Sequence, residues 1–211
     1  MAQARVHSTT KRPNGRAAAA PRAQLTPESW IEAATELLAE KSIDAVRVDV
    51  LAKILGVTRG SFYWHFTDRA DLLRSVLNAW RDKATEQVTQ RFEKKGVAPQ
   101  ALLKELLSLP FRGRSAEHAA RIELAIRAWA RRDPMARQAV DEADARRISY
   151  IAQVFSSLGF DIAEARARAF VLYAHTVAES VLHEQGTASQ KSERTALMER
   201  LLLARLAGES L

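Results

Sequence analysis

Apolar residues recur at intervals of three and four along most of the chain, and this spacing predicts amphipathic helices. The first helix is expected to begin after Thr26, where Pro27 suits the first helical position, and to end near Lys41. A short second helix follows from Val48. Gly56 ends it, because glycine readily takes the left-handed conformation found at helix C-termini. Strand-like alternation is nearly absent, so the pattern predicts an all-α protein.

The residues after this glycine predict a tight turn and further helices. Thr58 can cap a third helix of about two turns, which ends before Phe66. A long fourth helix is expected to open at Thr67 or Asp68 and to reach about Lys94, a span on the order of 40 Å. The remaining helical periods, separated by proline and glycine, lie at about residues 99–109, 116–132, 134–158, 161–185 and 191–208.

Composition narrows the possible partners. The formal net charge is +7 and the pI is near 10.0, a balance that attracts polyanions such as DNA, RNA or acidic membrane surfaces. The segment 1–24 has no acidic residue and no apolar period, which is typical of a disordered basic arm. Such an arm is either a solvated tail or a phosphate or minor-groove contact beside a DNA-binding domain. Its basic residues are Arg5, Lys11, Arg12, Arg16 and Arg22.

Several kinds of chemistry are excluded by what the sequence lacks. There is no cysteine, which excludes disulfides, thiol catalysis and Cys-ligated zinc. No apolar run approaches the roughly 18 residues of a membrane helix, and the N-terminus lacks the apolar core of a signal peptide, so we expect a cytoplasmic protein without a membrane partner. A Gly-rich phosphate loop, a His-x-x-x-His spacing and a nucleophile elbow are missing. We therefore expect no enzyme activity, no cofactor and no metal site.

The segment from Val48 to Leu73 carries the strongest functional pattern. Two short helices joined at Gly56 predict a helix-turn-helix, in which the second helix enters the major groove and the first crosses the backbone. The alternative is a helical hairpin whose aromatic residues are all core, but a two-turn helix cannot direct all of its aromatic side chains inward. The inward set is predicted to be Val57, Phe62 and Phe66, and the outward set Arg59, Ser61, Tyr63, Trp64 and His65.

This segment resembles the signature of the TetR family over roughly residues 28–75. The resemblance implies a three-helix DNA-binding domain over 25–73, which follows the arm over 1–24. It also implies that a long helix joins this domain to a helical ligand-binding and dimerisation domain over 74–211. The matching positions are Ala52, Gly56, Val57, Thr58, Gly60, Tyr63, His65 and Phe66, followed by a basic residue at Arg69 and by Leu72.

The resemblance implies two kinds of DNA contact, since base contacts set sequence preference and phosphate contacts set position. Arg59 is the best candidate for reading guanine, and Gly60 would let the helix lie close to the sugar-phosphate wall. Base edges would be approached by Arg59, Ser61 and Trp64, and phosphate oxygens would be bound by Thr58, Tyr63, His65 and Arg69.

Some positions depart from the family pattern. Arg47 stands where a Thr or Ser commonly begins the second helix, so the capping oxygen is lost, although its guanidinium could reach a phosphate. Val50 replaces a commonly polar residue. Arg69 replaces the usual Lys, which keeps the charge and changes the donor geometry.

A ligand pocket is hypothesised in the C-terminal half, because large rings with polar edges suit a small apolar or aromatic ligand that needs a few hydrogen bonds. The alternative for each of these residues is an ordinary core position. The candidate lining residues are Trp80, His118, Ile122, Trp129, Tyr150 and Tyr173.

The last two helical segments offer apolar faces with small residues that permit close helix approach. Two such helices from each subunit would form a four-helix homodimer interface. Two recognition helices about 34 Å apart could then occupy successive major grooves of a palindromic operator. The candidate interface residues are Phe170, Ala174, Val177, Val181, Leu197 and Leu201, with Leu206 on the same face.

These features predict a sequence-specific transcriptional regulator that binds double-stranded operator DNA as a homodimer. The expected mode is repression relieved by a small-molecule ligand. A ligand-independent or activating regulator is one alternative, and a basic helical adaptor protein is another.

Overall fold

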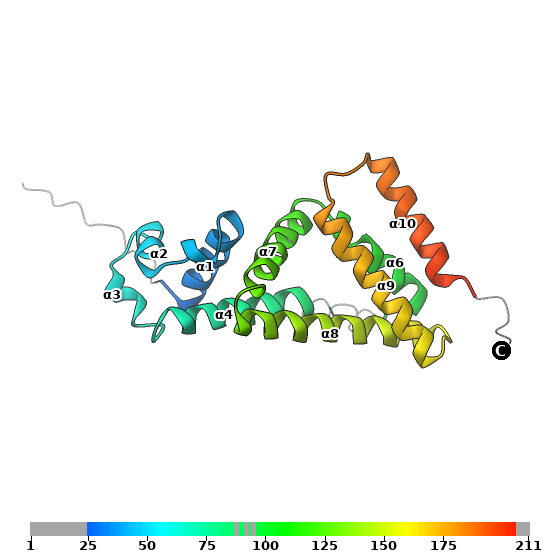
Figure 1. Ribbon diagram of the computed structural model, residues 1–211, viewed down its shortest axis with the longest axis horizontal. Helices are drawn as coiled ribbons and strands as arrows, with labels where there is room; N and C mark the ends of the chain where they lie inside the picture. Colours follow the sequence, from blue (N-terminus) through cyan, green and yellow to red (C-terminus); the bar gives the residue numbers. More distant parts are fainter. Residues whose placement is uncertain (1–24, 87–88, 91–92, 94–95, 206–211) are drawn as a thin grey trace, which may run out of the picture.

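The computed structural model describes residues 25–86, 89–90, 93 and 96–205, and all regular elements in these ranges are helical (Figure 1). This confirms the all-α prediction for the described residues. The predicted basic arm over 1–24, the predicted helix end at Lys94 and the predicted interface residue Leu206 lie outside them.

The helices follow the predicted order along the chain. The N-terminal half contains α1 Pro27–Glu40, the 3₁₀ helix η1 Ile43–Ala45, α2 Val48–Ile54, α3 Arg59–Phe62, α4 Arg69–Arg81 and the π-helical segment η2 Asp82–Glu86. The C-terminal half contains α6 Pro99–Ser108, the 3₁₀ helix η3 Leu109–Phe111, α7 Arg114–Ala130, α8 Pro134–Ser157, α9 Ile162–Val181 and α10 Ala188–Leu203.

Side-chain caps fix where several helices begin. The carboxylate of Asp68 accepts a hydrogen bond from an amide in the first turn of α4, and Asp133 and Asp161 do the same for α8 and α9. Each cap satisfies one of the amides that a helix N-terminus leaves without an intrahelical partner. Pro134 adds a preset backbone angle at the first position of α8.

Two predicted helices differ from the structure. The recognition helix α3 has one α-helical turn, not two: it is regular over Arg59–Phe62, and residues 63–65 form a hydrogen-bonded turn after it. The long fourth helix is regular only as far as Arg81. The wider π-helical turn of η2 interrupts the predicted long helix, and the described residues 89, 90 and 93 are α-helical again.

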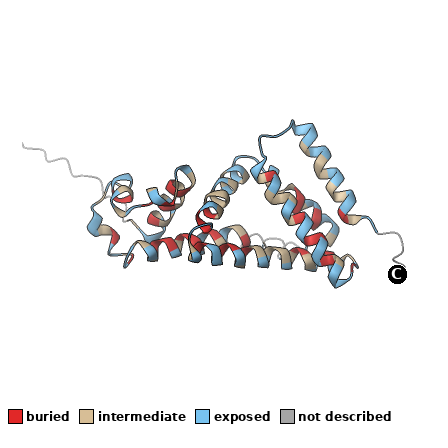
Figure 2. Ribbon diagram, viewed as in Figure 1, coloured by how far each residue is buried: buried red, intermediate tan, exposed pale blue. Residues whose placement is uncertain are grey.

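Buried apolar side chains form two clusters. The first cluster joins α1–α4 to the end of α7, around Ile126 and Trp129, and to the first half of α8, from Ala136 to Ala143. The second cluster joins α6, the second half of α8, α9 and Leu202 of α10. Buried segments accordingly occur toward both ends of the molecule (Figure 2). The first cluster therefore continues well past the predicted boundary at residues 73 and 74.

The molecule is elongated. Helices α1, α2 and α3 gather at one end, α6, α9 and α10 lie at the other, and α4 and α8 pack side by side between them (Figure 1). Helix α7 crosses between the two ends and contacts α1 as well as α8. Among the described residues, no helix has the length and apolarity needed to span a bilayer.

Candidate nucleic-acid interface

The turn between α2 and α3 has the geometry that the sequence predicts. Gly56 has a φ of 68°, a left-handed conformation in which other residue types are strained. The amide of Val57 donates to the carbonyl of Ala52 at 2.9 Å, and the amide of Gly56 donates to the carbonyl of Lys53 at 3.3 Å. These two bonds form a Schellman motif, which satisfies the free carbonyls at the end of α2. The motif ends α2 abruptly and directs the chain into α3.

Phe62 anchors α3 to the first cluster. Its side chain is fully buried, and its ring meets Trp30 of α1 edge-on at a centroid distance of 5.3 Å and stacks on Phe66 at 5.4 Å. Aromatic pairs at these distances add to the free energy gained from burial. A helix of four residues cannot be stable alone, so this ring holds α3 in place.

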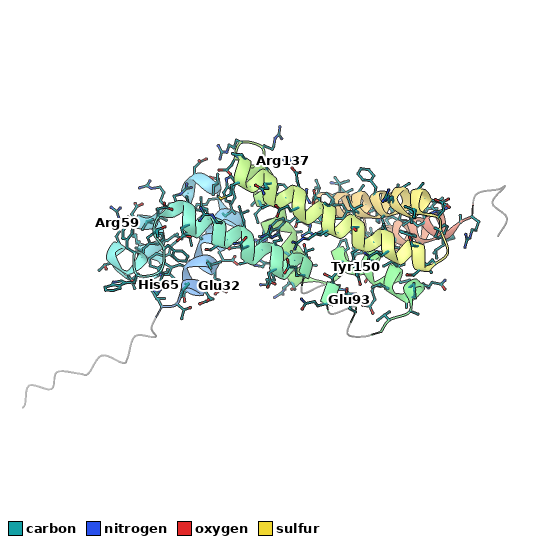
Figure 3. The ribbon with its side chains drawn as sticks, turned by 90° about the horizontal axis from the view of Figure 1, so that it is seen from below. Glu32, Arg59, His65, Glu93, Arg137 and Tyr150 are labelled. Carbon is teal, nitrogen blue, oxygen red and sulfur yellow. The ribbon has the colours of Figure 1, made fainter. Side chains whose placement is uncertain are left out.

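The opposite side of α3 and its following turn faces solvent. Trp64 is 87% exposed and Tyr63 is 56% exposed, and the side chain of Arg59 is exposed as well. Arg59 and His65 lie at one end of the molecule, away from Tyr150 and Glu93 (Figure 3). Exposing an indole ring to water costs free energy, so this surface is suited to contact with another molecule.

Gly60 is not required by the packing of the protein itself. A Cβ built at this position would meet only the Thr58 hydroxyl, at 3.6 Å, which is ordinary van der Waals contact. Thr58 and Gly60 are exposed, and Ser61 and His65 are half-buried beside them. The predicted contact residues on α3 therefore share one accessible end of the molecule, and a bare backbone at Gly60 leaves room for an external partner.

The two arginines that depart from the family pattern are engaged within the protein. Arg47 begins α2 without a side-chain cap, and its guanidinium pairs with Asp49 at 2.7 Å on an exposed surface. Arg69 is half-buried and donates to two backbone carbonyls of the segment before α2. Their phosphate contacts stay predictions, and for Arg69 the donors in use compete with that role.

Residues 31–76 match the family model described as bacterial regulatory proteins, tetR family. This segment of the chain is therefore a DNA-binding segment of the TetR type. The matched range contains α2, α3 and most of α4, and therefore the complete helix-turn-helix.

Curated transcriptional regulators match part of the chain. The transcriptional regulator AcuR of Cereibacter sphaeroides is 36% identical over 90 residues, which cover 43% of this chain and 41% of AcuR. The regulator AcrR of Shigella flexneri is 29% identical over 85 residues, which cover 40% of each protein. The chain thus spans about two fifths of the length of these relatives.

Solved structures resemble nearly the whole fold at low identity. A transcriptional regulator from Rhodococcus sp. Rha1 has a TM-score of 0.67 at 19% identity, covering 85% of this chain and 94% of the other. A regulator from Saccharomonospora viridis in complex with choline has a TM-score of 0.66 at 19% identity, with coverages of 83% and 92%. FadR from Bacillus subtilis in complex with stearoyl-CoA has a TM-score of 0.62 at 18% identity, with coverages of 85% and 98%. These likenesses establish the fold.

The predicted ligand-pocket residues do not all line one cavity. Trp129 and Trp80 are buried in the first cluster, against which Ile122 packs. The Nε2 atom of His118 lies 3.0 Å from a carboxylate oxygen of Glu36 on α1. Periodicity placed these side chains on apolar faces correctly, but it could not tell which helix each face meets.

Tyr150 is the member of that predicted set that borders a cavity. The cavity has a volume of about 410 Å³ and lies between α8 and the chain that continues from η2. Burial and the nearby carboxylate of Glu93 raise the pKa of Tyr150. The open cavity is lined by Glu86, Thr89, Gln90, Glu93, Arg146, Ser149, Tyr150 and Gln153, so of the predicted pocket residues it contains Tyr150 alone.

Tyr173 belongs to a polar network that sequence reasoning missed. Its hydroxyl donates to Asp144 at 2.6 Å and accepts from Arg127 at 2.8 Å and from Arg147 at 3.0 Å. Burial raises the pKa of Tyr173 to about 12, so the side chain is a neutral phenol that can both donate and accept.

The network extends from Tyr173 to the end of α4. Arg127 and Arg147 both donate to Glu123, at 2.7 and 2.9 Å, and Glu123 also accepts from the indole nitrogen of Trp80 at 3.2 Å. Arg147 reaches the hydroxyl of Thr85 on η2 at 3.0 Å. We call this set the junction network, and its members are Trp80, Thr85, Glu123, Arg127, Asp144, Arg147 and Tyr173. In the sequence, the helical spacings of Glu123 with Arg127 and of Asp144 with Arg147 were the features that could have indicated a charged network.

Most of the predicted dimer-interface residues are exposed in the single chain. Phe170 and Val181 of α9 are 62% and 52% exposed, and Leu197 and Leu201 of α10 are 48% and 58% exposed. Ala174 is exposed and Val177 is half-buried on the same stretch of α9. Large apolar side chains at this exposure are a surface that a partner can cover.

Proposed function

We propose that this chain is a dimeric repressor that binds operator DNA through α3 and is released by a small molecule. The observation that carries the proposal is the exposed face of Arg59, Tyr63 and Trp64 on a helix fixed from behind by the buried Phe62. A face of donors and aromatic edges on a rigid short helix suits insertion into a major groove.

Charge favours the same partner. The net charge of +7 draws the protein to the phosphate backbone, whereas Arg59 on the first turn of α3 is placed to select a base. The family match supports DNA binding, because it covers the helix-turn-helix itself.

Dimerisation follows from the exposed apolar faces of α9 and α10. The alternative is that other helices of the same chain cover these faces. Those helices already pack against the opposite face of α9, where Leu172 is fully buried. We infer that a second copy covers Phe170, Val181, Leu197 and Leu201, which presents two α3 helices to one duplex.

Ligand control is the finer part of the proposal. The cavity beside Tyr150 is lined by two carboxylates and one arginine. Its walls come from η2, which follows α4, and from α8, so a ligand there would contact both segments. Its lining offers charged and amide groups beside the ring of Tyr150, which suits a small ligand that has both polar and apolar parts. The solved relatives with choline and with stearoyl-CoA support ligand binding in this fold and leave its chemistry open.

The proposal is tested by selecting bound duplexes from a random DNA pool. We expect an inverted repeat, because two identical α3 helices read the two half-sites. Arg59→Ala should lower the affinity for the selected duplex by about 1–3 kcal/mol for each base that the arginine reads, and should leave the dimer intact. Arg114→Ala, at the exposed first residue of α7, is the charge-matched control and should leave the preference unchanged.

Other outcomes separate the rival functions. Binding that shows no sequence preference at any salt concentration would favour the basic adaptor and overturn the regulator. If the protein selects a palindromic duplex and raises the expression of a reporter gene placed behind that sequence, it is an activator. The expected absence of enzyme activity and the expected location in the cytoplasm stay predictions.

A further inference from the structure

Arg69 joins two parts of the chain that flank the helix-turn-helix. It is the first residue of α4, and its Nε atom donates to the carbonyl of Val46 at 2.5 Å while Nη2 donates to the carbonyl of Ile43 at 2.6 Å. Val46 is fully buried and Ile43 is nearly so. The acceptors therefore belong to a well-packed part of the backbone.

The two hydrogen bonds connect residues on either side of the helix-turn-helix. Val46 lies just before α2, and Arg69 lies just after the turn that follows α3. The two hydrogen bonds thus tie the entry of the α2–α3 unit to its exit. Closing a segment of this length restricts the conformations open to the unit, and α3, with a single turn, has little stability of its own.

We propose that Arg69 is a positioning residue, which clamps the base of the helix-turn-helix and so fixes the direction of α3. This inference rests on the proposed function of α3 in DNA binding. It gives Arg69 a role different from the phosphate contact that the family resemblance implies.

The donor geometry favours the clamp. The guanidinium is a planar fork, and here Nε and Nη2 on one side of the fork serve two carbonyls at once. A lysine, the residue that the family pattern has at this position, offers a single nitrogen. The carbonyl of Ile43 also accepts from the amide of Val46 at 3.2 Å, but the carbonyl of Val46 would lose its donor if Arg69 turned to a phosphate, and a partly buried carbonyl without a donor is costly.

The test compares three full-length variants. Arg69→Met removes the fork, Arg69→Lys keeps the charge without the fork, and Arg74→Met is the control. Arg74 is an exposed arginine on the same helix whose contact with Asp71 is long, at 3.4 Å. The probes are a duplex selected from a random pool and an unrelated duplex of equal length.

If Arg69 is a clamp, both Arg69 variants lose affinity for the selected duplex on the order of tenfold, because α3 is no longer fixed. Their binding to the unrelated duplex should keep the salt dependence of the Arg74→Met control. Hydrogen exchange at the amides of residues 43–47 should be faster in both Arg69 variants than in that control.

Two results would overturn the clamp. If Arg69→Met lowers the salt slope by roughly 0.9 for each phosphate no longer neutralised and Arg69→Lys restores it, the residue binds phosphate. If the amides of residues 43–47 exchange alike in all variants, the carbonyl bonds do not hold the unit. If the wild-type chain enriches no duplex, the proposed function fails instead, and the exchange measurement still decides the clamp.

Discussion

The two hydrophobic clusters differ in what they hold. The first cluster contains the helix-turn-helix together with the end of α7 and the first half of α8, whereas the second contains only helices of the C-terminal half. The body that carries α3 is therefore larger than the segment that matches the family model. Buried contacts therefore join α3 to the corner between α7 and α8.

The boundary between the clusters is polar. Along α8, Ala143 is the last residue of the first cluster and Ile151 is the first buried residue of the second, and Asp144 and Arg147 of the junction network lie between them. Polar partners across a boundary of this kind depend on geometry more strongly than apolar contacts do. The junction network therefore joins the two clusters across this boundary.

The largest expected loss of stability comes from removing a buried ring from either cluster. Phe62→Ala and Phe155→Ala each remove a fully buried ring, which should lower the free energy of unfolding by about 3–5 kcal/mol. We expect Phe62→Ala to speed amide exchange in α1–α4 and the first half of α8, and Phe155→Ala to do so in α6, α9 and the second half of α8. Hydrogen exchange resolved by segment checks both.

The same pair of variants can contradict the division into two clusters. If either substitution speeds exchange equally in all helices, the clusters form one cooperative unit and the boundary has no energetic meaning.

An intermediate effect is expected at the boundary. Glu123→Gln removes the charge that faces both Arg127 and Arg147, and we expect a loss of about 2 kcal/mol in the free energy of unfolding, since all three groups are largely buried. Denaturant titration measures this loss. Glu142→Gln is the matched control, because Glu142 pairs with Arg81 and is 41% exposed, and it should cost about 1 kcal/mol or less. Equal losses in the two variants would contradict a special role for the junction network.

The smallest effect concerns pH and α9. Burial lowers the pKa of His175 below its ordinary value of 6.5, and the positive charge of Arg194 acts in the same direction while Glu179 opposes it. Because the folded protein favours the neutral ring, its contribution to stability is present above about pH 6.5 and is lost as the pH falls below that value. His175→Gln should flatten this part of the stability profile, measured by thermal unfolding at several pH values. An unchanged profile would show that other groups cause the acid dependence.

Much of the fold could be predicted because local signals dictate it. Thr26 with Pro27, Gly56 and Pro134 are residues whose own conformational preferences start or end a helix, and the structure has helix ends at each. The inward and outward sets on α3 were predicted correctly for Phe62 and Trp64, because a short amphipathic helix has only one face to bury.

The remainder depends on contacts that are distant in sequence. A periodic pattern shows that Trp80 and Trp129 are buried, but not that they share the first cluster instead of lining a pocket. Charged residues such as Glu123 and Arg147 look like solvent-exposed helix positions until α7, α8 and α9 are placed together. The two hydrogen bonds of Arg69 could not be predicted for the same reason, since their acceptors lie 23 and 26 residues away.

Helix α8 is the one regular α-helix that contributes to both clusters among the described residues, and its 24 residues span about 36 Å. Deleting a single residue near its middle would rotate the second half by about 100° relative to the first. Val154 and Phe155 would then point away from α6 while Val140 kept its place. The residue count of α8 therefore sets how its buried face in one cluster is rotated relative to its buried face in the other.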